Sequence, residues 1–380
     1  MTFAEPRSTF APAKINLTLR IFGRRADGLH ELESLVAFAP FGDRLTLWPN
    51  ATLDLKVSGP MAAGTGPLAD NLVLRAARAL AAHIDGLRLG RFALFKRLPS
   101  GAGLGGGSAD AAAALRLIAE VNHLGLNDER IHAAARATGA DIPVCLDPWP
   151  RVMRGIGEIL STPLVLPKLG ILIVHPGLAL PTGPVFKALG LGPGEQYAGS
   201  SHPPQRGQVD CRRQGTPPPL RLPPGRLCPS STGSGEGRGK GASRRTQAHG
   251  AAPVPTLSSP RGGKGGDDLS PQAGRGQGCS HSGLPWHAEK DTQSAQRDAL
   301  LTFLASECND LESAAISVAP QIADVLRAIA ELAGCRLARM SGSGSACFGL
   351  FDSARAAAAA ARDLAAARPS WWVRTGLLGN

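Results

Sequence analysis

Long apolar runs are missing from this sequence of 380 residues. No segment approaches the roughly 18 consecutive apolar residues that a membrane-spanning helix requires. The first ten residues, MTFAEPRSTF, also lack the apolar core of a signal peptide. We therefore expect a cytoplasmic protein without a membrane partner.

Cysteine is scarce and irregularly spaced. The seven cysteines are an odd number, and they form no CxxC pair or Cys/His cluster, which argues against a disulfide framework and against a zinc site. Cys145, Cys308, Cys335 and Cys347 lie in apolar segments and are expected to be reduced core residues. The sequence assigns no metal ligands.

Aromatic residues make up only 4% of the chain, with one tyrosine. The formal net charge of +11 could indicate a nucleic-acid-binding protein, but no basic motif is interleaved with aromatic residues. Residues 195–297 carry 14 Lys and Arg against 7 Asp and Glu, whereas the rest of the chain carries 27 against 23. Because that remainder is only mildly basic, we expect no nucleic-acid partner.

Apolar periodicity is almost absent from residues 195–297, which contain 18 Gly and 13 Pro. This composition is typical of disordered segments. We therefore predict a long, disordered insert rich in Gly, Pro and Arg over residues 193–297. It could be a disordered extension, a basic binding tail, or translated material never selected as protein, such as a stretch read out of frame. The lack of periodicity favours the third origin.

Five glycines stand between a strand-forming run and a helix-forming run in residues 92–121. Glycine reaches positive φ at little cost and allows another group to approach the main chain, so the loop suits an anion held by backbone amides. The free N–H groups and the positive end of the following helix strengthen such a site. We expect Ser108 to cap this helix and Asp70 to cap the preceding one.

Other glycine-rich loops have to be distinguished from a phosphate loop. Gly101, Gly103 and Gly106 satisfy the GxGxxG pattern of dinucleotide-binding folds, but the acidic residue expected about 20 positions later would be Glu120, inside an alanine-rich helical run. No Gly-Lys-Ser or Gly-Lys-Thr follows, which argues against a Walker-type P-loop. A plain surface turn does not explain the order of strand, glycines and helix. A phosphate cradle of another lineage is therefore favoured.

Several polar residues interrupt apolar segments. Lys14 and Asn16 lie in a strand-forming run, His30 follows a turn, and Asp141 precedes an apolar stretch. Locally, each has an ordinary explanation: a solvated strand face for Lys14, a structural histidine for His30, and a helix cap for Asp141. Composition and spacing do not decide between these structural roles and a role in a functional site.

Seven motifs, taken together, resemble the GHMP kinases. They are PAKINLTL at 12–19, GLHELESL at 28–35, LPSGAGLGGGSADAAAAL at 98–115, GADIPV at 139–144, PTGPVF at 181–186, NDLE at 309–312 and MSGSGSACFGLF at 340–351. Within the family, the AKINL, GADIP and NDLE blocks are most similar to the kinases that phosphorylate a cytidine diphosphate conjugate of methylerythritol. The similarity covers about residues 8–192 and 298–380 and leaves out the insert.

The resemblance implies an α+β, two-domain GHMP kinase fold. Residues 1–160 would form the N-terminal ATP-binding domain, a ribosomal-protein-S5-like α/β domain. Residues 161–192 and 298–380 would form a C-terminal ferredoxin-like domain, interrupted by the insert over 193–297. The active site would lie between the two domains.

The resemblance also implies the reaction. ATP, with Mg2+, would donate its γ-phosphoryl group to the 2-hydroxyl of 4-diphosphocytidyl-2-C-methyl-D-erythritol, a small-molecule substrate of non-mevalonate isoprenoid precursor biosynthesis. The sequence alone does not decide whether this chain is a monomer or a homodimer.

The same resemblance assigns site residues by matched position. Lys14 and Asp141 are the implied catalytic pair, because phosphoryl transfer depends on positioning and charge neutralisation and a carboxylate can take the hydroxyl proton. The implied substrate-binding residues are Asn16, His30, Thr182 and Phe186. Of these, His30 and Phe186 would form part of the cytidine pocket. The implied ATP phosphate loop consists of Pro99, Ser100, Gly101, Ala102, Gly103, Leu104, Gly105, Gly106, Gly107, Ser108 and Ala109.

Two departures from the family pattern leave alternatives open. Leu29 stands where the family usually has tyrosine, so stacking on cytosine would be weaker and Phe186 would be the main ring. If the insert disturbs the pocket, the chain would be a catalytically impaired GHMP-like ATP-binding protein. A GHMP kinase for homoserine, mevalonate or a sugar is another alternative, and a nicotinamide oxidoreductase is the least favoured. The SGSGSA segment at 341–346 is either tight interdomain packing or, as favoured, a second turn facing substrate or phosphate.

Overall fold

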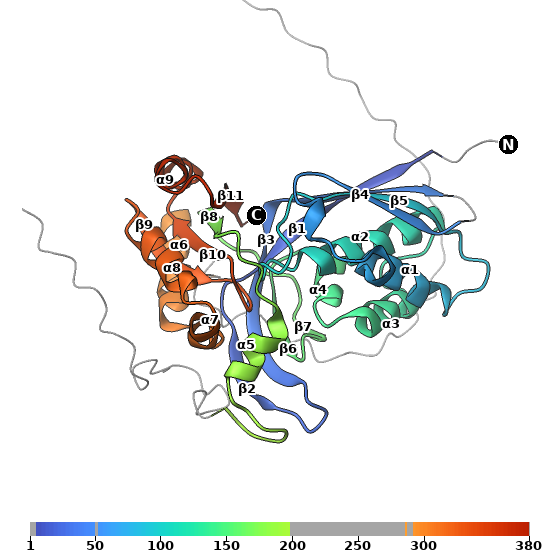
Figure 1. Cartoon of the computed structure of the whole chain (residues 1–380), viewed down its shortest axis with the longest axis horizontal. Helices are drawn as coiled ribbons and strands as arrows, with labels where there is room; N and C mark the ends of the chain where they lie inside the picture. Colours follow the sequence, from blue (N-terminus) through green and yellow to red (C-terminus); the bar gives the residue numbers. More distant parts are fainter. Residues whose placement is uncertain (1–4, 50–51, 198–285, 287–291, 380) are drawn as a thin grey trace, which may run out of the picture. The chain divides into compact units, whose positions relative to one another are not determined.

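The computed structural model describes residues 5–49, 52–197, 286 and 292–379. All of them belong to one compact unit, Met1–Arg213 with Gly278–Asn380. The strands are β1 (Arg7–Asn16), β2 (Arg20–Arg24), β3 (His30–Pro49), β4 (Asp54–Ser58), β5 (Gly90–Phe95), β6 (Arg151–Gly155), β7 (Ile159–Leu160), β8 (Leu169–His175), β9 (Cys335–Met340), β10 (Cys347–Phe351) and β11 (Trp372–Leu378) (Figure 1). The α-helices are α1 (Leu72–Ala81), α2 (Gly106–Val121), α3 (Glu129–Thr138), α4 (Ile142–Leu146), α5 (Thr182–Ala188), α6 (Gln293–Ser306), α7 (Glu312–Val318), α8 (Gln321–Ala330) and α9 (Ala354–Ala367).

The N-terminal sheet is organised around β3, a strand of 20 residues. The sheet order is β4-β5-β3-β6-β7, with β1 and β2 also pairing with β3. Strand β1 is buried on both faces from Ala11 onward. Because successive side chains of a strand point to opposite faces, Lys14 and Asn16 face away from the side on which Ala13 and Ile15 enter an apolar cluster.

Helices α1 to α4 gather beside this sheet (Figure 1). Helix α2 contacts β1 and β3 as well as the other three helices. Its run of small residues, Ala111 to Ala114, is fully buried, and alanine permits close packing without losing side-chain entropy. Leu115 and Ile118 are fully buried as well. The buried helix thereby holds the end of the glycine loop rigidly.

The C-terminal sheet contains four strands in the order β11-β8-β10-β9, and all its pairings are antiparallel. Strand β10 lies between β8 and β9, and β8 lies between β10 and β11, as in the two split βαβ units of a ferredoxin-like sheet. Helices α8 and α9 pack against this sheet. The two-sheet α+β architecture with a ferredoxin-like second domain is therefore confirmed.

One apolar cluster is shared by the two sheets. It contains Ala13 and Ile15 of β1, Ile171 of β8 and Phe348 of β10, together with Leu300 of α6. All five are completely buried. The strand that carries Lys14 is therefore packed on the C-terminal domain as well as on the N-terminal domain to which it belongs.

Both predicted helix caps were wrong, by one residue for α1 and by three residues for α2. Asn71, not Asp70, precedes α1, and its side chain accepts a hydrogen bond from the Val73 backbone N–H at 3.0 Å. Gly105, in the left-handed conformation, precedes α2, so Ser108 lies inside the first turn. Glycine takes this position because the chain enters the helix with φ of +61°.

Most of the insert predicted over 193–297 lies outside the described residues. At its start, the Gly194 N–H donates to Arg24 O at 2.7 Å and the Tyr197 N–H donates to Phe22 O at 2.8 Å. At its end, Trp286 is 2% exposed and α6 already begins at Gln293. The boundaries of the insert therefore stay a prediction. The first residues of the predicted insert are hydrogen-bonded to the backbone of β2.

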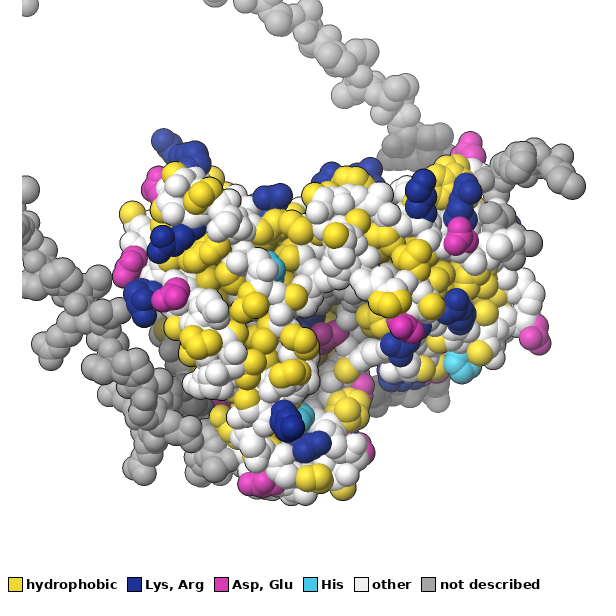
Figure 2. Space-filling model, viewed as in Figure 1, with side chains coloured by type: hydrophobic (Ala, Val, Ile, Leu, Met, Phe, Trp, Pro, Cys, Tyr) yellow, Lys and Arg dark blue, Asp and Glu magenta, His cyan; other side chains and the backbone are white. Residues whose placement is uncertain are grey.

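Charge is dispersed on the face of the molecule that Figure 2 shows. Figure 2 shows basic side chains in small, separate groups on the viewed face, interspersed with acidic ones. This distribution agrees with the expectation of a mildly basic folded part. Among the described residues, no helix is long and apolar enough to span a membrane.

Candidate active site

Lys14 and Asp141 lie together although 126 residues separate them in the chain. Lys14 Nζ is 3.1 Å from Asp141 Oδ1 and 3.1 Å from Asn16 Oδ1. The Lys14 side chain is 4% exposed, whereas that of Asp141 is 40% exposed. The pair thus combines a buried ammonium group with a carboxylate that remains accessible.

Asp141 occupies the residue before α4, but its side chain makes no capping hydrogen bond within the described chain. The carboxylate instead pairs with Lys14. The helix-cap explanation of Asp141 is therefore wrong, and its position beside Lys14 agrees with the pairing that the resemblance implied.

The glycine loop wraps around Lys14. The Lys14 N–H donates to Leu104 O at 2.9 Å. A Cβ added at Gly105 would lie 3.0 Å from Lys14 Cβ, which is closer than ordinary packing allows. Gly101, Gly103 and Gly105 all have positive φ, between +61° and +72°. Glycine is required at all three positions for the backbone conformation, and at Gly105 also for the close approach of the lysine.

The serine-rich turn, residues 341–346, packs directly on this loop. Ser341 Oγ donates to Gly103 O at 3.0 Å and accepts the Asn16 N–H at 3.2 Å. Ser343 Oγ is 3.0 Å from Thr182 Oγ1. The turn therefore joins the loop to residues predicted on the substrate side, and tight packing is an established part of its role.

A buried polar chain supports the substrate side. Asn16 Nδ2 donates to Ser34 Oγ at 2.8 Å, and Ser34 Oγ donates to Thr18 O at 2.5 Å. Asn16 is thereby fixed with its Oδ1 toward Lys14. Ser34 was missed by sequence reasoning, because serine in a strand gives no local signal of a partner 18 residues away.

His30 and Phe186 also lie together. Their ring centroids are 4.5 Å apart with an interplanar angle of 40°. Burial, and secondarily the charge of Arg24, lowers the pKa of His30. His30 Nε2 is buried and has no hydrogen-bond partner among the described residues. Leu29 is 47% exposed.

One cavity of about 570 Å³ joins most of these groups. The predicted site residues that line it are Lys14, Asn16, Asp141, Thr182, Phe186 and the loop residues from Pro99 to Ser108. Ala109 is buried behind the loop and does not line the cavity, and His30 reaches it only through its contact with Phe186. Gly342 and Ser343 of the serine-rich turn complete the wall.

A buried ion cluster beneath the loop was missed by sequence reasoning. Lys96 Nζ is 2.5 Å from Asp43 Oδ2 and 2.8 Å from Asp110 Oδ2. These three side chains are at most 4% exposed. Asp43 stands in a strand, Lys96 at a strand end and Asp110 in a helix, so no spacing in the sequence connects them.

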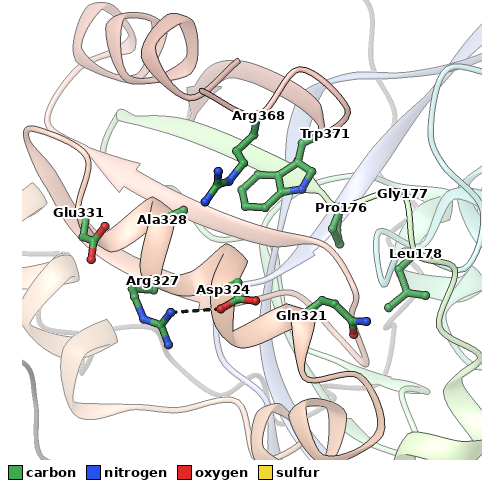
Figure 3. A pocket seen from close by; sticks show the side chains of 10 residues that line it. All are labelled: Pro176, Gly177, Leu178, Gln321, Asp324, Arg327, Ala328, Glu331, Arg368 and Trp371. Atoms are coloured by element: carbon green, nitrogen blue, oxygen red, sulfur yellow. Dashed lines mark hydrogen bonds and ion pairs between the residues drawn. The ribbon is translucent and has the colours of Figure 1, made fainter. Parts of the chain in front are cut away.

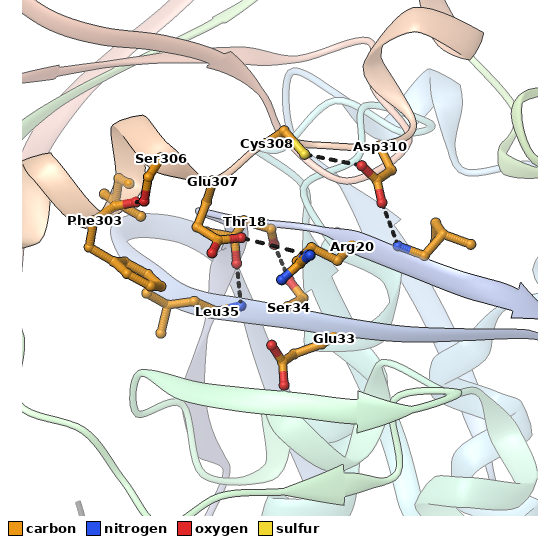
Figure 4. Close-up of polar contacts among 12 residues, drawn as sticks. Thr18, Arg20, Glu33, Ser34, Leu35, Phe303, Ser306, Glu307, Cys308 and Asp310 are labelled. Carbon is orange, nitrogen blue, oxygen red and sulfur yellow. Dashed lines mark hydrogen bonds and ion pairs between the residues drawn. The ribbon is translucent and has the colours of Figure 1, made fainter. Parts of the chain in front are cut away.

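The NDLE block anchors the serine-rich turn and strand β2. Asn309 Nδ2 donates to Met340 O at 2.9 Å and to Gly342 O at 2.8 Å. Asp310 Oδ2 accepts the Ile21 N–H at 2.7 Å, and its other oxygen accepts a hydrogen bond from Cys308 Sγ at 3.0 Å (Figure 4). Burial raises the pKa of Asp310. The block is therefore structural support for the wall of the cavity.

A second pocket, of about 630 Å³, lies on the C-terminal domain (Figure 3). Three of its four charged side chains are already engaged: Arg327 pairs with Asp324 at 3.1 Å, and the Arg368 guanidinium lies 5.5 Å from the centre of the Trp371 indole. No site residue predicted from the sequence is in its lining. The cavity around Lys14 is therefore the candidate active site.

Comparison with protein families defines the class. The model of the GHMP kinases N terminal domain matches residues 71–147, and that of the GHMP kinases C terminal domain matches residues 292–369. The first range contains the glycine loop and Asp141, and the second contains the serine-rich turn. The fold and the cavity thus correspond to an ATP-dependent small-molecule kinase.

Individual relatives define the branch of that class. A 4-diphosphocytidyl-2-C-methyl-D-erythritol kinase of Xanthobacter autotrophicus is 45% identical over 368 residues, 97% of each chain. A protein of the same name from Methylobacterium radiotolerans is 44% identical over 96% of each chain. A crystal structure of a 4-(cytidine 5'-diphospho)-2C-methyl-D-erythritol kinase has a TM-score of 0.61 and 27% identity, and covers 98% of this chain and 100% of its own. The chain belongs to the 4-diphosphocytidyl-2-C-methyl-D-erythritol kinase family of the GHMP kinases.

This membership confirms the resemblance carried by the seven motifs. It also rules out the nicotinamide oxidoreductase alternative, since the relatives are kinases. A homoserine kinase from Cytophaga hutchinsonii, with a TM-score of 0.56 at 15% identity, shares the fold alone.

Proposed function

We propose that this chain transfers the γ-phosphoryl group of MgATP to the 2-hydroxyl of 4-diphosphocytidyl-2-C-methyl-D-erythritol. The observation that carries the proposal is the 3.1 Å contact between Lys14 Nζ and Asp141 Oδ1 in a cavity walled by the glycine loop. The names of the relatives at 44–45% identity supply the substrate.

The loop would hold the polyphosphate. Backbone N–H groups at the start of α2, whose first residue is Gly106, are free to donate to phosphate oxygens, and the helix dipole favours negative charge there. This arrangement would place the γ-phosphate near Lys14, because Gly105 is packed against that side chain.

Asp141 would act as the general base. Its carboxylate would accept the proton of the substrate 2-hydroxyl while that oxygen forms a bond to the γ-phosphorus and the bond from phosphorus to the β-phosphate bridging oxygen breaks, which releases ADP. Lys14 donates to Asp141 and Asn16, so its third N–H is available for the transferred phosphoryl group. Charge neutralisation of this kind is the main contribution of protein groups to phosphoryl transfer.

The magnesium ion would enter as part of the MgATP substrate. Within the part of the chain that the structure describes, no group of three or more His, Cys, Asp or Glu side chains could hold a metal ion. Mg2+ in kinases is commonly held by phosphate oxygens, water and only one or two carboxylates. We assign no metal ligand in the chain.

The test is an ADP-release assay with the full chain. We expect turnover with the cytidyl substrate and less than 1% of that kcat/KM with homoserine or mevalonate. Turnover of those small alcohols at a similar rate would contradict the substrate assignment. Binding of ATP without turnover of any of them would support the catalytically impaired alternative.

Phe186 tests the cytidine side of the proposal. In the Phe186→Leu variant, KM for the cytidyl substrate should rise about 3–10-fold, because an aromatic contact is worth about 0.5–1.5 kcal/mol. KM for ATP serves as the internal control and should stay within twofold. An equal rise in both constants would mean that Phe186 supports the whole cavity rather than the cytosine.

A further inference from the structure

The Asp43–Lys96–Asp110 cluster supports both ends of the phosphate loop. Asp43 Oδ1 accepts the N–H groups of Arg97 and Leu98, at 2.5 and 2.9 Å, where the chain enters the loop. Lys96 Nζ then links Asp43 to Asp110, which stands in α2 where the chain has left the loop. A shift in this cluster would therefore move the loop at its two attachment points.

The cluster contains two carboxyl groups for one ammonium group. If both carboxyl groups were ionised, it would carry a net charge of −1 in a fully buried setting, which is unfavourable. Asp43 uses both of its oxygens. Asp110 Oδ1, by contrast, is buried and has no hydrogen-bond partner among the described residues. The arrangement therefore leaves one acceptor where a proton can bind.

This acceptor belongs to the same cavity as the reacting groups. Lys96 and Asp110 line the cavity that contains Lys14 and Asp141. A Cβ added at Gly106, the first residue of α2, would lie 3.5 Å from Lys96 Nζ. Lys96 therefore lies against the first turn of α2, and Asp110 is 2.8 Å from Lys96, so we expect a polyphosphate bound at that turn to repel the charge of Asp110.

The groups around Asp110 do not supply a second neutralising charge. Burial raises its pKa to about 7 in spite of the attraction of Lys96, and the nearby charge of Asp43 adds to the rise. Burial by itself would lower the pKa of Lys96, but the negative charges of Asp110 and Asp43 more than offset this effect, so the pKa of Lys96 is raised. On α4, burial raises the pKa of Cys145 to about 12, so that thiol is neutral.

The remaining neighbours are apolar or already paired. Lys14 on β1 is engaged with Asp141 and Asn16. Helix α1 buries Val73, Ala76 and Ala77, and α3 buries Ile131 and Ala134. The two arginines of α1, Arg75 and Arg78, are exposed.

We propose that Asp110 binds one proton together with the nucleotide, so that the Asp43–Lys96–Asp110 cluster is neutral while it positions the phosphate loop. The inference rests on the proposed function, because it assumes that the loop binds the polyphosphate. Asp110 is a positioning residue in this account and does not touch the transferred group.

The sign of the pH dependence follows from linkage. The polyphosphate disfavours the charged carboxylate, so nucleotide binding raises the affinity of Asp110 for its proton. Nucleotide affinity must then fall as the pH rises through the pKa of Asp110 in the free enzyme, about 7. Below that pH the proton is already bound, and the dependence disappears.

The experiment is a calorimetric titration of the full chain with MgADP at pH 6.5 and pH 8.5. For the wild type, we expect Kd to increase about fivefold between the two values. Asp110→Asn resembles the protonated acid in shape and charge, so its Kd should match that of the wild type at pH 6.5 and change less than twofold at pH 8.5. Asp363→Asn, on the exposed face of α9, is the matched control and should behave as the wild type does.

A second measurement uses the wild type alone and keeps the test valid if the variant fails to fold. Titrations at pH 7.5 in buffers of different ionisation enthalpy should reveal uptake of about half a proton per MgADP bound. Equal pH slopes in wild type and Asp110→Asn, or no proton uptake by the wild type, would overturn this inference while leaving the kinase assignment intact. Absence of MgADP binding by the wild type would refute the nucleotide site itself.

Discussion

Replacing Asp141 by asparagine is expected to lower kcat by about 10²–10⁴-fold, the usual contribution of a general base. Asparagine keeps the size of the side chain and can still accept a hydrogen bond from Lys14, whose Nζ lies 3.1 Å from Asp141 Oδ1. It cannot take a proton from the substrate hydroxyl. The loss should therefore appear in the chemical step, measured as single-turnover ADP formation.

Nucleotide binding separates this effect from misfolding. The Kd for MgADP should change less than threefold in Asp141→Asn, because the loop amides that would hold the phosphates are unaltered. Asp85→Asn, at an exposed position, is the matched control and should keep wild-type kcat. If Asp141→Asn retained more than a tenth of wild-type kcat, another group would have to be the base.

The second large effect is expected from Gly103→Ala. A Cβ at this position would lie 2.3 Å from Ser341 O and 2.8 Å from Gly344 N, so the loop and the serine-rich turn could not both keep their places. Gly103 also has φ of +72°, which costs a residue with a side chain about 1–2 kcal/mol. Together with overpacking of about 1–3 kcal/mol, the free energy of unfolding should fall by about 2–5 kcal/mol.

Gly66→Ala separates the two contributions. Gly66 has a similar φ of +69°, but an added Cβ would meet no atom within 4 Å. This control should lose only the conformational part, about 1–2 kcal/mol. Thermal unfolding of the two variants measures the difference, and kcat/KM should fall only in Gly103→Ala. Equal melting temperatures would show that the turn adapts without cost.

The phosphate loop could be predicted from the sequence because its signal is local. Strand β5, three glycines with positive φ, and α2 follow one another within 32 residues, Gly90 to Val121, and each glycine satisfies a backbone requirement at its own position. The pairing of Lys14 with Asp141 could not be derived in this way. It depends on a contact across the fold, and only the family resemblance indicated it.

The ion cluster beneath the loop could not be predicted at all. Asp43 lies in β3, Lys96 directly follows β5 and Asp110 lies in α2, and their importance arises from burial in one place rather than from residue type. The helix caps failed for a different reason. Asn71 and Asp70 are both good capping residues, and the backbone at Asn71, with ψ of 132°, decided between them.

The apolar cluster shared by the two sheets limits how substrates can enter. Ala13 and Ile15 flank Lys14 in sequence and are packed with Ile171 and Phe348 of the other domain. A swinging motion of one domain away from the other would expose this surface to water, at a cost that grows with the apolar area. Exchange of nucleotide and product should therefore proceed through small local adjustments at the rim of the cavity, and turnover would not wait for a hinge to open.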